Sequence, residues 1–310
     1  MLDALQKNNK IIVNTDLDGI FSAMILHHYL NCEIAGFCNS VDTVWIDKNK
    51  INAIDNAVYI DMFVVQNDVV CIDQHIIAVD EEHSRKIRSL GTKFNPNLDN
   101  PRFHKPPNSY YLKYPFGTVH YIIANLEKNA INLDLQLDNA VQPDLSFMDL
   151  LLRADDTMKT TVNSNYIQNA QNWWTWLINY SNKGKTVLSM YNYLDSLTGT
   201  DVACKKSDTT KLLTGAYHCD SPDGGFKNIC DMTGSLHVKV KNYIRFLANA
   251  SKLNVFDLNM KLEAKVGKAN RISLNARQME VIRNMTSKVF SYAFVRSPER
   301  SQHFSYTVMN

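Results

Sequence analysis

Residues 11–26 read IIVNTDLDGIFSAMIL: an apolar segment, an acidic turn and the start of a helix. We expect a strand over residues 11–16 and a helix over residues 19–31. Side chains two apart on an extended strand point the same way, so Asp16 and Asp18 are predicted to face one spot beyond the strand. Two adjacent carboxylates favour a divalent cation between them. The alternative is an ordinary turn, in which an Asp caps the helix and Asp-Gly marks the bend.

Two further apolar segments also end in acidic residues. Residues 57–61 read AVYID and end in Asp61, and residues 69–75 read VVCIDQH and end in Asp73, Gln74 and His75. Near-continuous apolar strands are typical of a parallel sheet with both faces covered. Right-handed crossovers bring the ends of such strands to one edge, where open α/β sheets bind ligands. We therefore predict an α/β fold whose N-terminal parallel sheet carries helices on both faces.

The charges divide the chain into an acidic and a basic part. Residues 1–204 hold 16 Lys and Arg against 23 Asp and Glu, whereas residues 205–310 hold 17 against 8. This asymmetry favours a metal-loaded domain beside one that holds a polyanion, although a basic solvated surface would give the same count. We predict a catalytic domain over 1–164, a helical connector over 165–204, and a smaller, basic α+β domain over 205–310.

Several residues outside the acidic strand ends are candidates for binding phosphate or bases. Gly117-Thr118 opens a predicted helix, which offers either a phosphate cradle or an ordinary N-cap. Arg296 and Arg300 lie near the turn of a predicted terminal hairpin, where they meet a phosphate or form a solvated edge. The tryptophans of the connector are expected in the core, with a base-stacking platform as the alternative.

The cysteines and the apolar segments of the chain indicate the cellular compartment in which we expect it. The six cysteines form no CxxC pair, the N-terminus has no apolar signal core, and no apolar run has the length of a membrane span. We expect a cytoplasmic protein without a membrane partner.

With these acidic ends in this order, residues 10–160 resemble the DHH phosphoesterase superfamily. Residues 14–20, NTDLDGI, with Ser22, are similar to the first motif of RecJ-like exonucleases and nano-RNases. Asp61 matches the second motif, and Asp73-Gln74-His75 stands where Asp-His-His is usual. Asp156, or its neighbour Asp155, matches the fourth motif. Gln74 departs from the family, and Gly224-Gly225 lacks the histidine of the usual Gly-Gly-Gly-His motif.

The resemblance implies a site for two Mn²⁺ or Mg²⁺ ions. The expected metal ligands are Asp16, Asp18, Asp61, Gln74 and Asp156. Asp73 would orient its neighbours, and His75 would contact a phosphate or assist the leaving group. The expected substrate contacts are Asn14, Gly117, Thr118, Arg296 and Arg300.

The function implied is a phosphodiesterase that hydrolyses single-stranded nucleic acid or short oligonucleotides by metal activation of water. One alternative is a phosphodiesterase or phosphatase for a small nucleotide, such as a cyclic dinucleotide. Another is a catalytically degenerate member that binds nucleic acid or a protein, an alternative that rests on Gln74.

Overall fold

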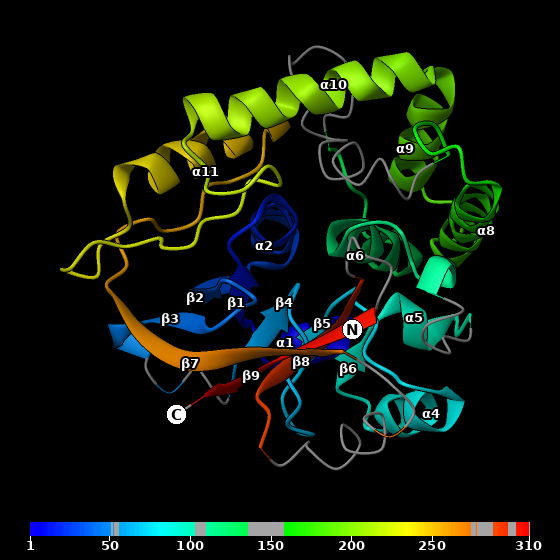
Figure 1. Cartoon of the computed structure of the whole chain (residues 1–310). Helices are drawn as coiled ribbons and strands as arrows, with labels where there is room; N and C mark the ends of the chain where they lie inside the picture. The colour runs from blue at the N-terminus through cyan, green and yellow to red at the C-terminus, as the bar shows by residue number, and fades with distance from the viewer. Residues whose placement is uncertain are drawn as a thin grey trace.

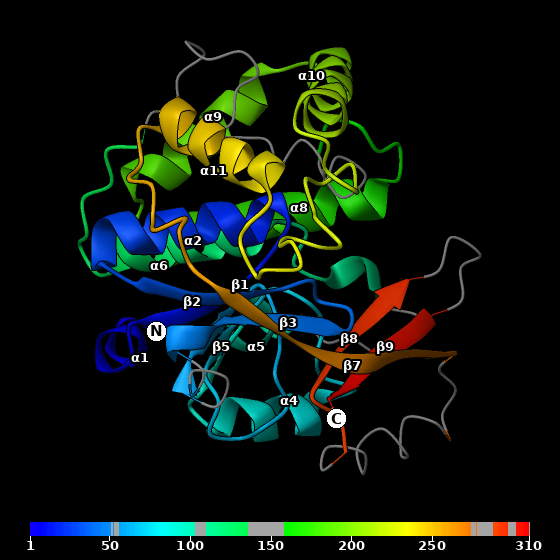
Figure 2. The same cartoon turned by 90° about the vertical axis from the view of Figure 1, so that its left-hand side faces the viewer.

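A computed structural model of the chain describes residues 1–50, 52, 56–102, 110–135, 158–273, 277, 288–296 and 302–309. Its centre is a nine-stranded sheet in the order β6-β5-β4-β1-β2-β3-β7-β9-β8. Most of the helices cover one face of this sheet, and α4 lies on the other face (Figures 1 and 2). The predicted α/β fold class is confirmed.

Five neighbouring strands are parallel, as expected for the N-terminal region. They are β6 (Lys93–Phe94), β5 (Cys71–Ile72), β4 (Val58–Ile60), β1 (Lys10–Asn14) and β2 (Glu33–Cys38). Their apolar residues are almost entirely buried because both faces of the sheet are covered. The strand order reverses at β1, which has β2 on one side and β4 on the other.

The remaining four strands are antiparallel to their neighbours. β3 (Thr43–Asp47) pairs with β2, the long β7 (Leu262–Ser273) pairs with β3, and β9 (Gln302–Met309) lies between β7 and β8 (Ser291–Arg296). The predicted terminal hairpin is therefore confirmed as β8–β9. The strands of the basic C-terminal part extend the sheet of the N-terminal part, so the sheet is mixed and continuous, and the predicted domain boundaries remain predictions.

The helical layer over the sheet is built from segments far apart in sequence. It contains α2 (Leu17–Leu30), α6 (Thr118–Lys128), α8 (Ser164–Tyr180), α9 (Lys185–Ser196) and α11 (Val238–Ser251) (Figure 2). Beyond it lie α10 (Gly199–Lys211) and the π-helical turn η5 (Leu212–Ala216). Trp173 and Trp174 of α8 are 0% and 1% exposed, and the Trp173 indole donates to the Leu112 carbonyl (3.0 Å). Both are core residues rather than a base-stacking surface.

The other described helices are short. They are α1 (Leu2–Lys7) before β1, α4 (Glu81–Ser89) after β5, α5 (Pro96–Asp99) after β6, and the 3-10 turns η1 (Lys48–Lys50) and η2 (Tyr110–Leu112). α5 forms in a segment rich in Asn and Pro because Asn95 caps it and Pro96 occupies its first turn. No helix among these described segments is long and apolar enough to cross a membrane.

Candidate metal centre

Asp16, the first carboxylate of the acidic turn, lies between β1 and α2. It is the N-cap of α2, and one of its carboxylate oxygens accepts from the Gly19 amide (2.9 Å). A Cβ on Gly19 would collide with the backbone carbonyl of Asn14, so only glycine lets the helix start this close to the strand. Asp16 therefore does cap the helix, and this role uses only one of its two carboxylate oxygens.

Asp18 does not share an extended strand with Asp16. β1 ends at Asn14 and α2 begins at Leu17, so Asp18 lies in the first helical turn. The prediction that Asp16 and Asp18 both extend from one strand and face the same position was therefore wrong. Asp18 is buried, and its two oxygens accept from the backbone amides of Thr118 (2.7 Å) and Val119 (2.8 Å) at the start of α6.

The N-terminus of α6 consequently binds a carboxylate of the chain itself. Gly117 is the N-cap of α6, as the sequence indicated, and the first two amides of the helix point at Asp18. This satisfies two donors that a helix leaves without internal partners. A substrate phosphate at this helix end would have to displace Asp18, so the cradle at Gly117 and Thr118 stays a prediction.

Asp61 follows β4 in a left-handed backbone conformation, with φ of 58°. Its carboxylate accepts from the Thr118 hydroxyl (2.7 Å) and from the Asn14 side-chain amide (2.9 Å). The same Asn14 amide donates to Asp16 (2.9 Å), so it links the ends of β1 and β4. A non-glycine residue in this region costs about 1–3 kcal/mol, which persists only where the surroundings impose it.

Asp73, Gln74 and His75 follow β5. Asp73 is 1% exposed and accepts from the backbone amide of His75 (3.1 Å) and from its ring Nδ1 (2.7 Å). The Gln74 side-chain nitrogen lies 3.3 Å from His75 Nε2. These contacts assign the His75 proton to Nδ1, with Nε2 as the acceptor. Asp73 therefore fixes the orientation of the imidazole.

Three of these groups come close enough to share one cation. A carboxylate oxygen of Asp61, one of Asp73 and a ring nitrogen of His75 all lie within 4.8 Å of one another. They sit at the carboxyl ends of the adjacent strands β4 and β5 (Figure 1). Carboxylate oxygens and an imidazole nitrogen are common ligands of divalent metal ions in proteins. The acidic strand ends thus form a group that could hold a metal ion.

Two asparagines that sequence reasoning missed support this group from the next strand. Asn95 follows β6 and donates to the His75 carbonyl (2.9 Å), and Asn97 donates to the Gln74 carbonyl (2.8 Å). Asn97 also accepts from the Tyr114 amide (2.8 Å). The sequence did offer one indication, because Asn95 directly follows the apolar end of β6. The high Asn and Pro content of the segment instead suggested a loop.

A loop of the C-terminal part packs on the acidic turn. The Thr15 hydroxyl donates to the Phe226 carbonyl (2.9 Å), and the Leu17 amide donates to the Asp223 carbonyl (3.0 Å). A Cβ on Gly225 would lie 3.5 Å from that of Asp16. Nothing local in residues 221–225 of the sequence indicates contact with a segment 200 residues away.

The terminal hairpin lies against the end of β5. The Phe294 amide of β8 donates to the Ile76 carbonyl (3.0 Å), directly after His75. The backbone of Arg296 is two residues further along β8. The Arg296 side chain, Arg300, Asp155 and Asp156 lie outside the described part of the chain, so their predicted roles remain predictions.

Cys38 at the end of β2 is an unsuitable nucleophile. Burial, with the Asp61 and Asp16 carboxylates nearby, raises the pKa of its thiol, which stays protonated at neutral pH.

Neither protein-family models nor curated proteins nor solved structures match this chain. The resemblance to DHH phosphoesterases therefore rests on the motifs alone.

Proposed function

We propose that the chain is a divalent-metal-dependent phosphoesterase of the DHH type. The observation that carries this proposal is the convergence of Asp61, Asp73 and His75 at adjacent strand ends. Asn14 and Thr118 hold the Asp61 carboxylate, and Asp73 holds the imidazole. Buried carboxylates kept this close to one another are costly without a cation, which favours a metal as their partner.

Asp61, Asp73 and His75 would hold Mn²⁺ or Mg²⁺. When bound, such an ion polarises a phosphoryl oxygen and lowers the pKa of a water molecule. Asp16, Asp18, Gln74 and Asp156 are proposed as further ligands for a second ion. Asp18 would serve only if it exchanged its contacts with α6 for the metal.

The residues of the chain contribute positioning and proton transfer. Asp73 keeps the His75 proton on Nδ1, which leaves the Nε2 lone pair for a metal ion or a substrate proton. Gln74 must release Nε2 for either role, because its amide lies 3.3 Å away. Asn14 keeps the carboxylates of Asp16 and Asp61 on one side of the strand ends.

We propose single-stranded nucleic acid or a short oligonucleotide as the substrate. The proposal is supported by the 17 Lys and Arg against 8 Asp and Glu in residues 205–310. The loop at 221–226 joins this basic part to the acidic turn. A cytoplasmic location is part of the proposal, since all six cysteines are free thiols.

A second candidate, a degenerate member that binds nucleic acid without cleaving it, is favoured by the contact between Gln74 and His75. A histidine at position 74 would offer a stronger ligand to Mn²⁺ than an amide does. The Gln74→His variant therefore separates the two candidates.

The test is hydrolysis of an end-labelled single-stranded oligonucleotide with Mn²⁺. We expect cleavage by the wild type and at least about a 100-fold loss in Asp61→Asn, which keeps the side-chain shape. Asp68→Asn, an exposed site on the loop after β4, is the matched control and should cleave normally. Cleavage only in Gln74→His would identify the degenerate binder. No cleavage by any folded variant would redirect the assay to cyclic dinucleotides.

A further inference from the structure

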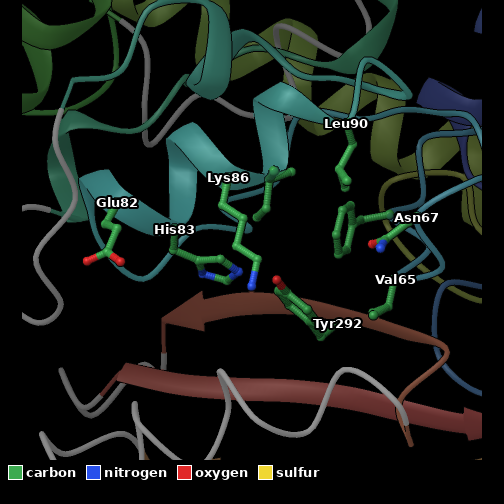
Figure 3. A pocket seen from close by; sticks show the side chains of 9 residues that line it. Val65, Asn67, Glu82, His83, Lys86, Leu90 and Tyr292 are labelled. Carbon is green, nitrogen blue, oxygen red and sulfur yellow. The ribbon is translucent and has the colours of Figure 1, made fainter.

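A cavity of about 270 Å³ lies apart from the acidic strand ends, between α4, residues 63–67 and β8 (Figure 3). Nothing in the proposed reaction uses it. Its volume is close to the lower end of the range for small-molecule sites, about 300 Å³. The side chains around it fall into an apolar wall and a polar rim, which together define what it can bind.

The apolar wall is aromatic. The rings of Phe63 and Tyr292 have centroids 4.9 Å apart and are each 5% exposed. The Tyr292 hydroxyl donates to the Ile77 carbonyl (2.8 Å), so the polar end of this side chain is already bonded. Val65, Ile87 and Leu90 complete the apolar lining, and Figure 3 labels Val65 and Leu90. Such a surface favours a flat, apolar ligand body through offset or edge contacts.

The lining carries one cation, Lys86, and one carboxylate, Glu82. Lys86 of α4 reaches into the space between the helix and Tyr292, whereas Glu82 of the same helix points away from it (Figure 3). Their spacing of four residues usually favours an ion pair. Among the described residues, Lys86 forms no ion pair within 4.0 Å. The ammonium group is therefore available to an anion.

Apart from Lys86 and Glu82, the polar groups of the rim are His83 and Asn67. His83 Nδ1 accepts from the Val79 amide (3.3 Å), which leaves Nε2 as an N–H donor when the ring is neutral. Burial, reinforced by Lys86, lowers the pKa of His83 to about 4, so the ring is neutral at pH 7. Asn67 adds an amide. One cation, one N–H donor and one amide suit a single anionic group.

We propose that this cavity binds a small molecule with a flat apolar ring system and one carboxylate or phosphate. The ring system would lie on Phe63 and Tyr292, and the anionic group would contact Lys86 and His83. The inference does not depend on the proposed phosphoesterase activity, because neither the lining nor its chemistry includes a candidate metal ligand.

The test is isothermal titration calorimetry with two probes of equal shape, 2-naphthoate and 2-naphthalenemethanol, at pH 7 in EDTA. The chelator removes divalent metal, so naphthoate cannot bind through an ion at the acidic strand ends. We expect one naphthoate per chain, with about tenfold weaker binding of the neutral alcohol. Lys86→Gln should weaken naphthoate about tenfold and leave the alcohol unchanged.

The control is Arg85→Gln, which removes an exposed cation on the same helix outside the cavity lining. It should leave both affinities unchanged. No saturable naphthoate binding, or equal naphthoate affinity in the wild type and Lys86→Gln, would overturn the proposal. An equal loss in Arg85→Gln would also overturn it, because the effect would then come from the general charge of the helix.

Discussion

At the residue scale, the backbone of Asp61 is the most informative detail. Asp61 has a left-handed backbone conformation between two parallel strands, where glycine would carry a smaller conformational free-energy cost. The side chain is held by Asn14 and Thr118, so the turn delivers its oxygens toward Asp73 and His75. The strained conformation is understandable if the position serves a metal ion.

The backbone of Asp61 leads to a stability prediction. In EDTA, Asp61→Gly should be more stable than Asp61→Ala by about 1 kcal/mol. Alanine is strained in the left-handed conformation, whereas glycine adopts it without strain. Urea denaturation of the two variants measures the difference. At the exposed Asp68, where φ is not positive, the glycine variant should show no such advantage. Equal stability of the two Asp61 variants would contradict the conformation described.

Asp18 should be a stability residue whether or not it binds metal. Asp18→Ala leaves the buried Thr118 and Val119 amides without their acceptor, which should cost about 2–3 kcal/mol of unfolding free energy. Chemical denaturation in EDTA measures this loss. The comparison variant is Asp201→Ala, since Asp201 closes the exposed capping box of α10. It should lose less, and a smaller loss for Asp18→Ala than for Asp201→Ala would refute the assignment.

At the scale of the element, the start of α4 depends on a neutral His83. Asp80 caps the helix by accepting from the His83 amide (2.9 Å), and the His83 ring accepts from the Val79 amide. A protonated ring would lose that acceptor and would place a positive charge at the positive end of the helix. The pKa of His83 accordingly falls to about 4, mainly through burial.

His83 should make the protein less stable as the pH falls. Its folded pKa of about 4 lies below its ordinary value of 6.5, so the unfolded chain binds the proton more readily. Unfolding free energy should therefore decline from pH 6.5 toward pH 4, by up to about 3 kcal/mol from this residue. His83→Asn should remove that part of the decline. His218→Asn, at an exposed site, should leave it intact, and identical pH profiles for wild type and His83→Asn would disprove the prediction.

At the scale of the whole molecule, the C-terminal part is built into the N-terminal sheet. β7 pairs with β3 over five residues of β3, from Thr43 to Asp47. One apolar core runs from Leu5 to Leu262 and includes residues of every helix in the layer over the sheet. The charge division near residue 205 therefore does not coincide with a break in the sheet or in this core.

This continuity predicts one cooperative unfolding transition. Far-ultraviolet circular dichroism and tryptophan fluorescence should give the same urea midpoint, because Trp45 lies in the sheet and Trp173, Trp174 and Trp176 lie in α8. Titration in EDTA measures both signals on one sample. Two separated midpoints would mean that the halves unfold independently, against the shared core.

The parts of this fold that were predictable from sequence are the local ones. Apolar runs that end in Asp61 and Asp73, and the alternating segments of the hairpin, define strands by their own periodicity. The contacts of Asn95, Asn97 and the loop at 221–226 were not predictable, because they depend on which distant segments the folded chain brings together. Asp18 was misplaced because the helix begins two residues earlier than its apolar spacing suggested.

If Asp61, Asp73 and His75 hold a metal ion, titration of the protein with Mn²⁺ in a calorimeter should detect its binding. We expect saturable binding to the wild type, about tenfold or more weaker binding in Asp61→Asn and His75→Gln, and no change in Asp68→Asn. Circular dichroism would verify that the variants are folded. No saturable binding by the wild type, or equal affinity in all four proteins, would contradict the account.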